Sequence, residues 1–282
     1  MSESHTAERT EDAGSVVRGV ARRRGDTVRT LEDHIAEEVP VAFVYNDAPF
    51  AVMMATPADL DDFAQGFALS EGIVEAFDDA QVASVEHLLE GVEIRVRIPQ
   101  DRAEILQQRR RSMSGRSGCG VCGSELLEAA LRSPAPVGEG IKVTASALQR
   151  ALRELRGLQP LNARTGATHA AGWALADGRV VLVREDVGRH NALDKLIGAM
   201  HRAGHDPQAG FLVVTSRASY EMAMKAASAG IAFMAAISAP TALAISLAQR
   251  TGLTLLGFAR EDGHAVYTHA PRFIEDIHED RP

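Results

Sequence analysis

Two hydrophobic periods alternate along the second half of the chain. Short runs rich in Val, Ile, Leu and Phe are typical of strands, and stretches with apolar residues three and four positions apart are typical of helices. The predicted strands cover residues 180–183, 211–215, 231–237 and 253–258, and the predicted helices cover residues 191–200, 219–229 and 241–250. Strands that alternate with helices through short links predict parallel strands joined by right-handed crossovers. We therefore expect a layered α/β domain with a mostly parallel sheet.

The first half of the chain shows paired strands instead. Asn46-Asp47 separates two apolar runs and predicts a hairpin. Thr56 suits the N-cap and Pro57 the first position of a helix that follows at once. The predicted strands cover residues 39–45, 50–55, 82–89 and 92–98, and the predicted helices cover residues 101–111, 125–131 and 145–156. We expect the first structured residues near Val39.

Breaks in composition predict the domain boundaries. Ser133-Pro134-Ala135-Pro136 interrupts the pattern between the two halves, and the first residues are rich in Glu, Thr and Ser. We predict disordered tails over residues 1–15 and 279–282. Between them we predict a smaller α+β region over 16–132, which ends in a cysteine loop, and an α/β cofactor-binding domain over 133–278.

Composition narrows the function classes. The chain has 282 residues, 45% of them hydrophobic, with a net charge of −8 and a pI near 5.7. An acidic chain argues against general nucleic-acid binding. The start of the chain lacks the apolar segment of a secretory signal, and no run approaches the roughly 20 apolar residues of a membrane span. We expect a cytoplasmic protein that binds neither nucleic acid nor membranes.

Both cysteines of the chain lie in one short loop, Cys119-Gly120-Val121-Cys122, with a glycine on either side. Glycines impose little backbone preference, so we expect a flexible loop. Arginines at positions 109–111 and 116 precede it, and positive charge lowers the pKa of a thiol from roughly 8.5. In a reducing cytosol such a pair is catalytic or metal-binding more often than a structural disulfide.

Other readings of the two thiols remain open at this point. A structural zinc site needs two further ligands, such as His169, His190 or residues of a second subunit. A zinc nucleobase deaminase is disfavoured, because Gly118 stands where that motif has proline and no His-x-Glu precedes it at the right spacing. A thioredoxin-type pair is chemically possible, but that motif belongs to a small βαβ context.

Three polar clusters follow predicted strands of the second half, at residues 184–191, 216–219 and 259–263. Arginines, hydroxyls and helix N-termini bind phosphate, and carboxylates accept from ribose hydroxyls, so the clusters predict a nucleotide-bearing ligand. Structural roles compete with this interpretation. Asn191 suits a capping arrangement, Ser216 and Ser219 suit N-caps, and Glu185 and Asp186 suit ion pairs with neighbouring arginines. His190 is as compatible with a structural role as with a site, and Trp173 suits the core.

Several segments, in order, resemble the FdhD family of formate dehydrogenase accessory sulfurtransferases. They include residues 53–57, 66–72, 119–123, 165–169, 184–195, 216–221 and 238–241, within a resemblance that spans roughly Val39 to His269. Residues 184–195, Arg-Glu-Asp-Val-Gly-Arg-His-Asn-Ala-Leu-Asp-Lys, form the longest and most specific of these. The chain departs from the family in its acidic segment before Val16 and in lacking a glycine between Ser216 and Arg217.

The resemblance implies a cytoplasmic sulfur carrier that acts as a sulfurtransferase. It would take persulfide sulfur from a cysteine desulfurase and pass it to a molybdenum bis-pterin guanine dinucleotide cofactor, which formate dehydrogenase then needs. By position, Cys119 matches the persulfide cysteine and Cys122 its partner, with no bound metal implied. The resemblance also implies a cytidine-deaminase-like fold and a homodimer.

The resemblance and the strand-end clusters together assign residues to the cofactor, or to a guanine nucleotide in its place. These residues are Phe258, Ala259, Arg260, Glu261, Asp262, Gly263, Glu185, Asp186, Arg189, His190, Ser216 and Arg217. Two alternatives remain: a non-catalytic chaperone of the molybdenum cofactor, in which the cysteines only cover the ligand, and a dithiol oxidoreductase that transfers no sulfur.

Overall fold

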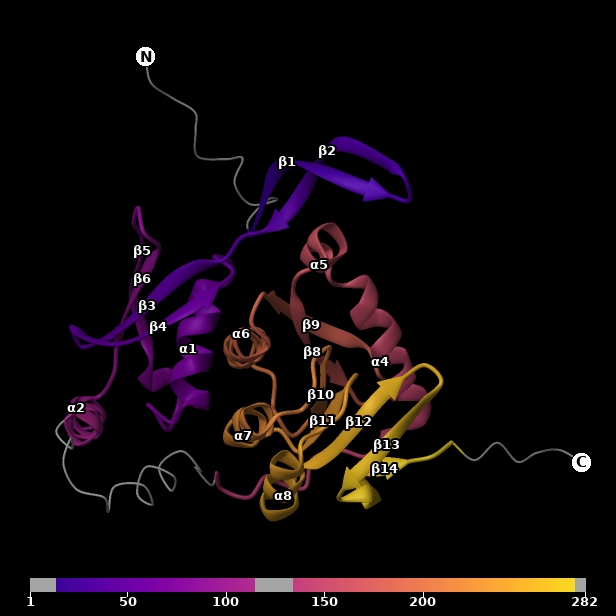
Figure 1. The fold of residues 1–282 in the computed structure, drawn as a ribbon. Helices are drawn as coiled ribbons and strands as arrows, with labels where there is room; N and C mark the ends of the chain where they lie inside the picture. Colours follow the sequence, from indigo (N-terminus) through magenta and orange to yellow (C-terminus); the bar gives the residue numbers. More distant parts are fainter. Residues whose placement is uncertain (1–13, 115–133, 277–282) are drawn as a thin grey trace, which may run out of the picture.

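The computed structural model describes residues 14–114 and 134–276, and shows two main sheets with their helices and a separate hairpin (Figure 1). The larger sheet and the helices around it are built from residues after 140, and the smaller sheet lies beside them. This mixed α/β architecture confirms the predicted class. The cytidine-deaminase-like layering stays a prediction, as do the domain boundaries.

The larger sheet has six strands in the order β13-β12-β11-β10-β8-β9. The strands are β8 (His169–Leu175), β9 (Val180–Asp186), β10 (Gly210–Val214), β11 (Phe233–Ala236), β12 (Thr254–Arg260) and β13 (Gly263–Thr268). Only the central pairs β10–β11 and β11–β12 are parallel, whereas β8 runs antiparallel to both neighbours and β13 antiparallel to β12. The expected mostly parallel sheet is therefore wrong, because β8 and β13, which the sequence pattern does not predict, run antiparallel to their neighbours.

Helices cover both faces of this sheet. Strands β8 to β12 pack with α6 (Arg189–Arg202), α7 (Tyr220–Ser228) and α8 (Ala242–Thr251) in one core and with α4 (Ala145–Gly157) in another. Ser219 caps α7 as expected, Thr241 caps α8, and Trp173 lies fully buried in the first core. The short α5 (Pro160–Thr165) follows α4, and β7 (Val143–Thr144) pairs with β14 (Phe273–Ile274).

The smaller sheet has the order β4-β3-β6-β5. Its strands are β3 (Val39–Tyr45), β4 (Ala48–Ala55), β5 (Gln81–His87) and β6 (Val92–Arg97), and its helices are α1 (Leu60–Ser70) and α2 (Gln100–Ser114). The predicted strands and the second helix are confirmed. The predicted start of the first helix is wrong: α1 begins at Leu60, after Asp59 in a left-handed conformation. Thr56 is instead fully buried and bonds to α/β-domain residues described below.

An unpredicted hairpin precedes this region. Strand β1 (Ser15–Arg24) pairs antiparallel with β2 (Thr27–Ala36), and the ribbon stands away from the body above α5 (Figure 1). Arginines and acidic residues interrupt its apolar alternation, so the period-two signal is weak. The first structured residues therefore precede Val39, and Ser15 belongs to a strand.

Two glycines allow α1 and α6 to cross in close contact. A methyl group at Gly66 would overlap the backbone oxygen of Asp194, and one at Gly198 would overlap the backbone oxygen of Asp62. Since both obstacles are backbone atoms, a side chain at either position can be accepted only if the helices separate. This crossing fixes the smaller region against the α/β domain.

Alanine at Gly66 is expected to destabilise the protein by about 3 kcal/mol, the upper part of the range for overpacked sites. Alanine at Gly157, at the open end of α4 with no atom near the added methyl, is the control and is expected to leave stability unchanged or slightly raised. Urea unfolding of both variants measures the difference. Equal stabilities would show that the helices tolerate a wider separation.

Candidate functional site

A cavity of about 340 Å³ lies at the carboxyl edge of the larger sheet. Strands β9, β10, β11 and β12 all end at this edge, which is where ligands collect in α/β sheets. Helices α4 and α5 supply its other wall. The lining residues are Leu152, Leu155, Arg156, Gln159, Asn162, Thr168, His169, Thr215, Ile237, Ala259, Arg260 and Glu261.

The polar groups of this cavity suit an anionic ligand. Arg156 and Arg260 face it, and Arg156 forms a largely exposed 3.0 Å ion pair with Glu261. Burial, helped by the positive charge of Arg189, lowers the pKa of His169, so its imidazole is neutral at pH 7. The volume lies at the low end of the roughly 300–1,000 Å³ of small-molecule sites, which fits one nucleotide-sized moiety.

Three of the predicted cofactor residues, Ala259, Arg260 and Glu261, line the cavity. Phe258 does not, although it is 45% exposed and adopts a left-handed conformation at the irregular end of β12. Asp262 lies in the exposed turn from β12 to β13, and Gly263 is the exposed first residue of β13. The sequence pattern did not predict Gln159 and Asn162 as site residues. Their position just after a predicted helix was the only feature that could have indicated them.

Glu185 holds a helix in place. Its carboxylate accepts from the backbone nitrogens of Leu161 and Asn162 at 2.9 and 2.7 Å and from the Thr168 hydroxyl at 3.1 Å. These bonds satisfy the first N–H groups of α5. The Glu185 carboxylate thus positions α5 in the cavity wall, and these bonds occupy the oxygens that would accept from a ribose.

Asp186 joins the two regions of the protein and is fully buried. It accepts from the backbone nitrogens of Thr56 and Gly188, at 3.0 and 2.7 Å, and pairs with Lys195 at 2.6 Å. Asn191 donates to Asp186 and to the Met54 carbonyl, so the expected capping role of Asn191 is wrong and Gly188 is the N-cap of α6.

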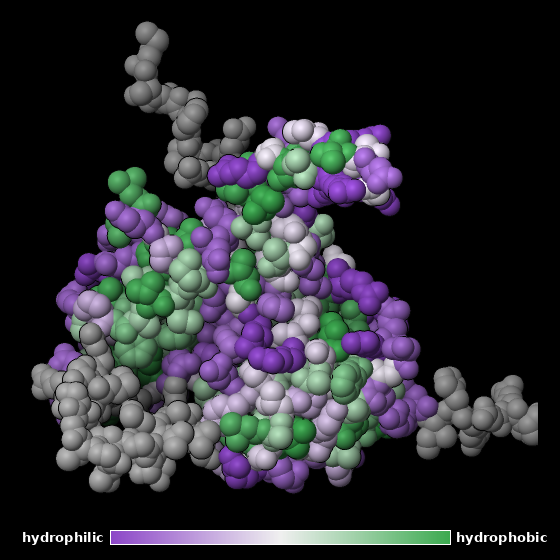
Figure 2. Space-filling view, viewed as in Figure 1, coloured by the Kyte–Doolittle hydropathy of each residue, from purple (hydrophilic) through white to green (hydrophobic). Residues whose placement is uncertain are grey.

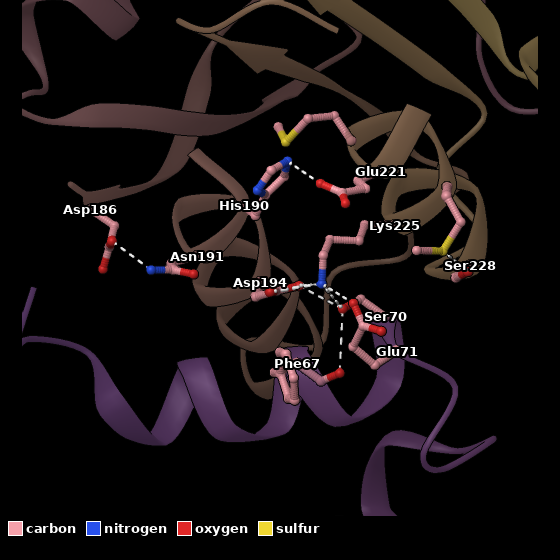
Figure 3. Close-up of polar contacts among 12 residues, drawn as sticks. Phe67, Ser70, Glu71, Asp186, His190, Asn191, Asp194, Glu221, Lys225 and Ser228 are labelled. Atoms are coloured by element: carbon pink, nitrogen blue, oxygen red, sulfur yellow. Dashed lines mark hydrogen bonds and ion pairs between the residues drawn. The ribbon is translucent and has the colours of Figure 1, made fainter. Parts of the chain in front are cut away.

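A second buried polar cluster ties α1 to α6 and α7 (Figure 3). The Lys225 ammonium lies 2.9 Å from Asp194, 2.7 Å from Glu71 and 3.1 Å from the Ser70 hydroxyl, which itself donates to Asp194 at 2.5 Å. Burial raises the pKa of Asp194 to about 6. Burial lowers the pKa of Lys225, but the carboxylates of Asp194 and Glu71 outweigh this and raise it, so Asp194 and Lys225 are both charged at pH 7. The most specific motif of the chain therefore builds a junction between the two regions.

The remaining predicted residues lie at the N-termini of α6 and α7. His190 pairs with Glu221 at 2.8 Å, as Figure 3 shows, and lies 3.5 Å from the Ser219 hydroxyl. Ser216 is buried and donates to the Arg217 carbonyl, while Arg217 is exposed. The Nε atom of Arg189 is buried without a hydrogen-bond partner among the described residues. None of these residues lines the cavity.

The charge state of His190 predicts a pH dependence. Burial lowers its pKa from 6.5 to about 4, although Glu221 opposes the shift. The unfolded state therefore binds more protons between these values, and stability is lost as the pH falls through this window. We expect wild type to lose about 1 kcal/mol more than a His190→Gln variant on going from pH 6.5 to about 5. Urea unfolding at both pH values measures this, and parallel curves would contradict it.

The predicted catalytic residues Cys119 and Cys122, and the predicted helix 125–131, lie outside the described residues. Within residues 14–114 and 134–276, no group of three or more His, Asp or Glu side chains could hold a metal ion. In the same ranges no helix is long and apolar enough to cross a membrane.

Comparison with known proteins assigns the family. The model of the FdhD/NarQ family matches residues 36–274. The chain belongs to the FdhD/NarQ family. Among FdhD/NarQ relatives, a protein of Xanthomonas euvesicatoria named sulfur carrier protein FdhD is 61% identical over 259 residues, which cover 92% of each chain. One with the same name from Cupriavidus necator is 51% identical and covers 90% of this chain and 88% of its own.

A solved structure shares the FdhD/NarQ fold seen here. It is described as a formate dehydrogenase accessory protein from Desulfotalea psychrophila, and it superposes with a TM-score of 0.72 over 93% of this chain and all of its own. Since the two sequences are 23% identical, the likeness supports the fold alone. The β1–β2 hairpin precedes the first residue of the family match almost entirely.

Proposed function

We propose that this chain is a cytoplasmic sulfur carrier that moves sulfur through a persulfide on Cys119. One observation carries the proposal: proteins named sulfur carrier protein FdhD are up to 61% identical over nearly the whole chain, in which Cys119 and Cys122 are the only cysteines. The donor would be a cysteine desulfurase. The acceptor would be the molybdenum bis-pterin guanine dinucleotide cofactor of formate dehydrogenase.

The loading step needs no oxidant. The Cys119 thiolate attacks the terminal sulfur of the desulfurase persulfide, so a new S–S bond forms on Cys119 while the S–S bond of the donor breaks. The donor cysteine leaves as a thiolate and takes up the proton. The transferred sulfur keeps its oxidation state.

The release step gives Cys122 a role. Its thiolate attacks the inner sulfur of the Cys119 persulfide, forms a disulfide with it and expels hydrosulfide, which passes to the metal of the acceptor. The transferred sulfur is reduced by two electrons as the two cysteines are oxidised. A cellular thiol reductant then restores both thiols for the next cycle.

The cavity at the carboxyl edge is the proposed docking site for one nucleotide end of the acceptor. Arg156 and Arg260 offer guanidinium groups to a diphosphate, and Gln159 and Asn162 offer amides to a base or ribose. A cavity of 340 Å³ is too small for the whole bis-dinucleotide, so the rest of it would extend outside. A homodimer and a cytidine-deaminase-like fold belong to the same proposal.

Mass spectrometry tests the carrier function. The full chain is incubated with a cysteine desulfurase and cysteine, then digested and analysed without reductant. We expect a peptide that contains Cys119 to gain the mass of one sulfur atom and to lose it with dithiothreitol. A chain that stays unmodified, yet still supports formate dehydrogenase maturation, would favour a non-catalytic cofactor chaperone.

A further inference from the structure

The hairpin of β1 and β2 carries an arginine cluster with a defined geometry. Residues directly paired across an antiparallel ribbon share one face, and here Arg22 is paired with Arg29 and Arg24 with Thr27. Together with Leu31 these residues line a concavity of about 460 Å³. Three guanidinium groups thus converge on one side of the ribbon, which we call the arginine face.

Few acidic groups neutralise the arginine face. Asp33 pairs with Arg22 at 2.6 Å, whereas Arg24 and Arg29 form no ion pair with any residue in the described ranges. Like charges directly opposite each other destabilise a ribbon. The Arg22–Arg29 pair therefore opposes folding of an element that, as a two-stranded ribbon, is already marginally stable.

The opposite face of the ribbon carries one arginine, Arg23, together with Glu32. Arg23 is paired there with Val28, donates to the Gly25 carbonyl and lies 3.7 Å from Asp26. Arg23 is thus held by contacts within the turn, while its neighbour Arg24 belongs to the arginine face. The concentration of charge belongs to one face, not to the hairpin as a whole.

The position of the hairpin places strand β2 beside the body of the protein. Strand β2 packs against α5, which also lines the 340 Å³ cavity through Asn162. Figures 1 and 2 show the ribbon overhanging the body above α5, with an open notch beneath it. Strand β2 and the wall of the cavity therefore share α5 as a neighbour.

We propose that the arginine face is a second anion-binding site, which takes the diphosphate group of a nucleotide or inorganic pyrophosphate. Guanidinium groups match phosphate oxygens with two parallel hydrogen bonds each, and a bound diphosphate would neutralise the like-charge pair. Convergence on one concavity favours a compact anion over an extended acidic surface. The site goes beyond the proposed function, since it does not require sulfur on Cys119.

Isothermal titration of the full chain with inorganic pyrophosphate at low salt tests the site. We expect Arg24→Gln and Arg29→Gln each to weaken binding roughly tenfold, since each removes a charge-assisted contact. Arg23→Gln is the matched control, with the same charge change one residue away, and is expected to stay within about twofold. Without ligand, Arg29→Gln should melt no lower than wild type because it removes the like-charge pair.

Each outcome of the titrations supports or overturns the proposal. If Arg23→Gln and Arg24→Gln weaken binding equally, the affinity depends on net charge alone and the proposal is overturned. Identical binding by wild type and Arg29→Gln would also overturn it. A decaglutamate peptide that binds more tightly than pyrophosphate would also overturn it, in favour of an acidic protein partner. A titration with GDP separates the two diphosphate sources. If Arg24→Gln weakens GDP binding, the arginine face takes a nucleotide. If only Arg260→Gln weakens GDP binding, the ligand of the arginine face is inorganic pyrophosphate. The sulfur-loading assay is a separate readout, so either proposal can fail alone.

Discussion

Serine in place of Cys119 is expected to lower sulfur loading by roughly 100-fold or more, because the hydroxyl cannot act as the thiolate nucleophile at neutral pH. Maturation of formate dehydrogenase should fall with it. Loading is measured by mass spectrometry after incubation with the desulfurase, and maturation by formate oxidation in cells that depend on this chain.

Cys122→Ser is the matched control, three positions along the chain with the same atom exchanged. Because the proposed mechanism uses Cys122 only in release, this variant is expected to load sulfur normally and to hold it longer than wild type. The assignment of the two thiols fails if Cys122→Ser does not load. A disulfide forms during wild-type turnover in both mechanisms, so added sulfur separates them: a dithiol oxidoreductase would gain none in wild type or in either variant.

Methionine in place of Lys225 is expected to destabilise the protein by about 3–5 kcal/mol at pH 7, because it leaves a buried carboxylate without its counter-charge. Asp194 is fully buried, and Glu71 shares the same ammonium group. Without Lys225 the pKa of Asp194 should rise further from about 6. The folded state then binds a proton that the unfolded state releases, so the variant should regain stability as the pH falls from 7 toward 5.

The double variant Lys225→Met with Asp194→Asn provides the control, since it removes the charge together with its partner. It is expected to recover at least half of the lost stability, and its pH dependence should flatten. Urea unfolding of the two variants and wild type at both pH values measures the effects. A single variant as stable as wild type would show that the junction between α1, α6 and α7 depends on apolar packing alone.

Local pattern predicted most helices and strands of the described residues, though not α5, because those signals involve residues two to four positions apart. Ser219 and Thr241 cap helices as their residue types indicate, and Trp173 is in the core. Strand β8 escaped prediction because alanine and glycine make up most of its centre, and only its partners β9 and β10 on either side make it a strand.

The polar motifs predict functional roles less well than the apolar pattern predicts secondary structure, and the reason is physical. Glu185, Asp186 and Asn191 have the side chains that a nucleotide site needs, but the same groups also satisfy buried backbone donors and ammonium groups. Their partners Thr56, Leu161 and Lys195 are distant in sequence or lie on another element, so no local pattern distinguishes the two roles. By contrast, Ala259 and Arg260 end strand β12 and Glu261 follows it, so their place at the carboxyl edge follows from the topology.

The amino-acid sequence by itself determined the α/β class, the succession of most elements, the family and the pair of thiols in one glycine-rich segment. The tertiary structure alone decided the strand order and direction, the close crossing of α1 and α6, the junction around Lys225, and which arginines share one face of the hairpin. Periodicity and motifs are properties of neighbouring residues. Strand pairing and buried charge depend on contacts between distant segments, whose free energies no local window contains.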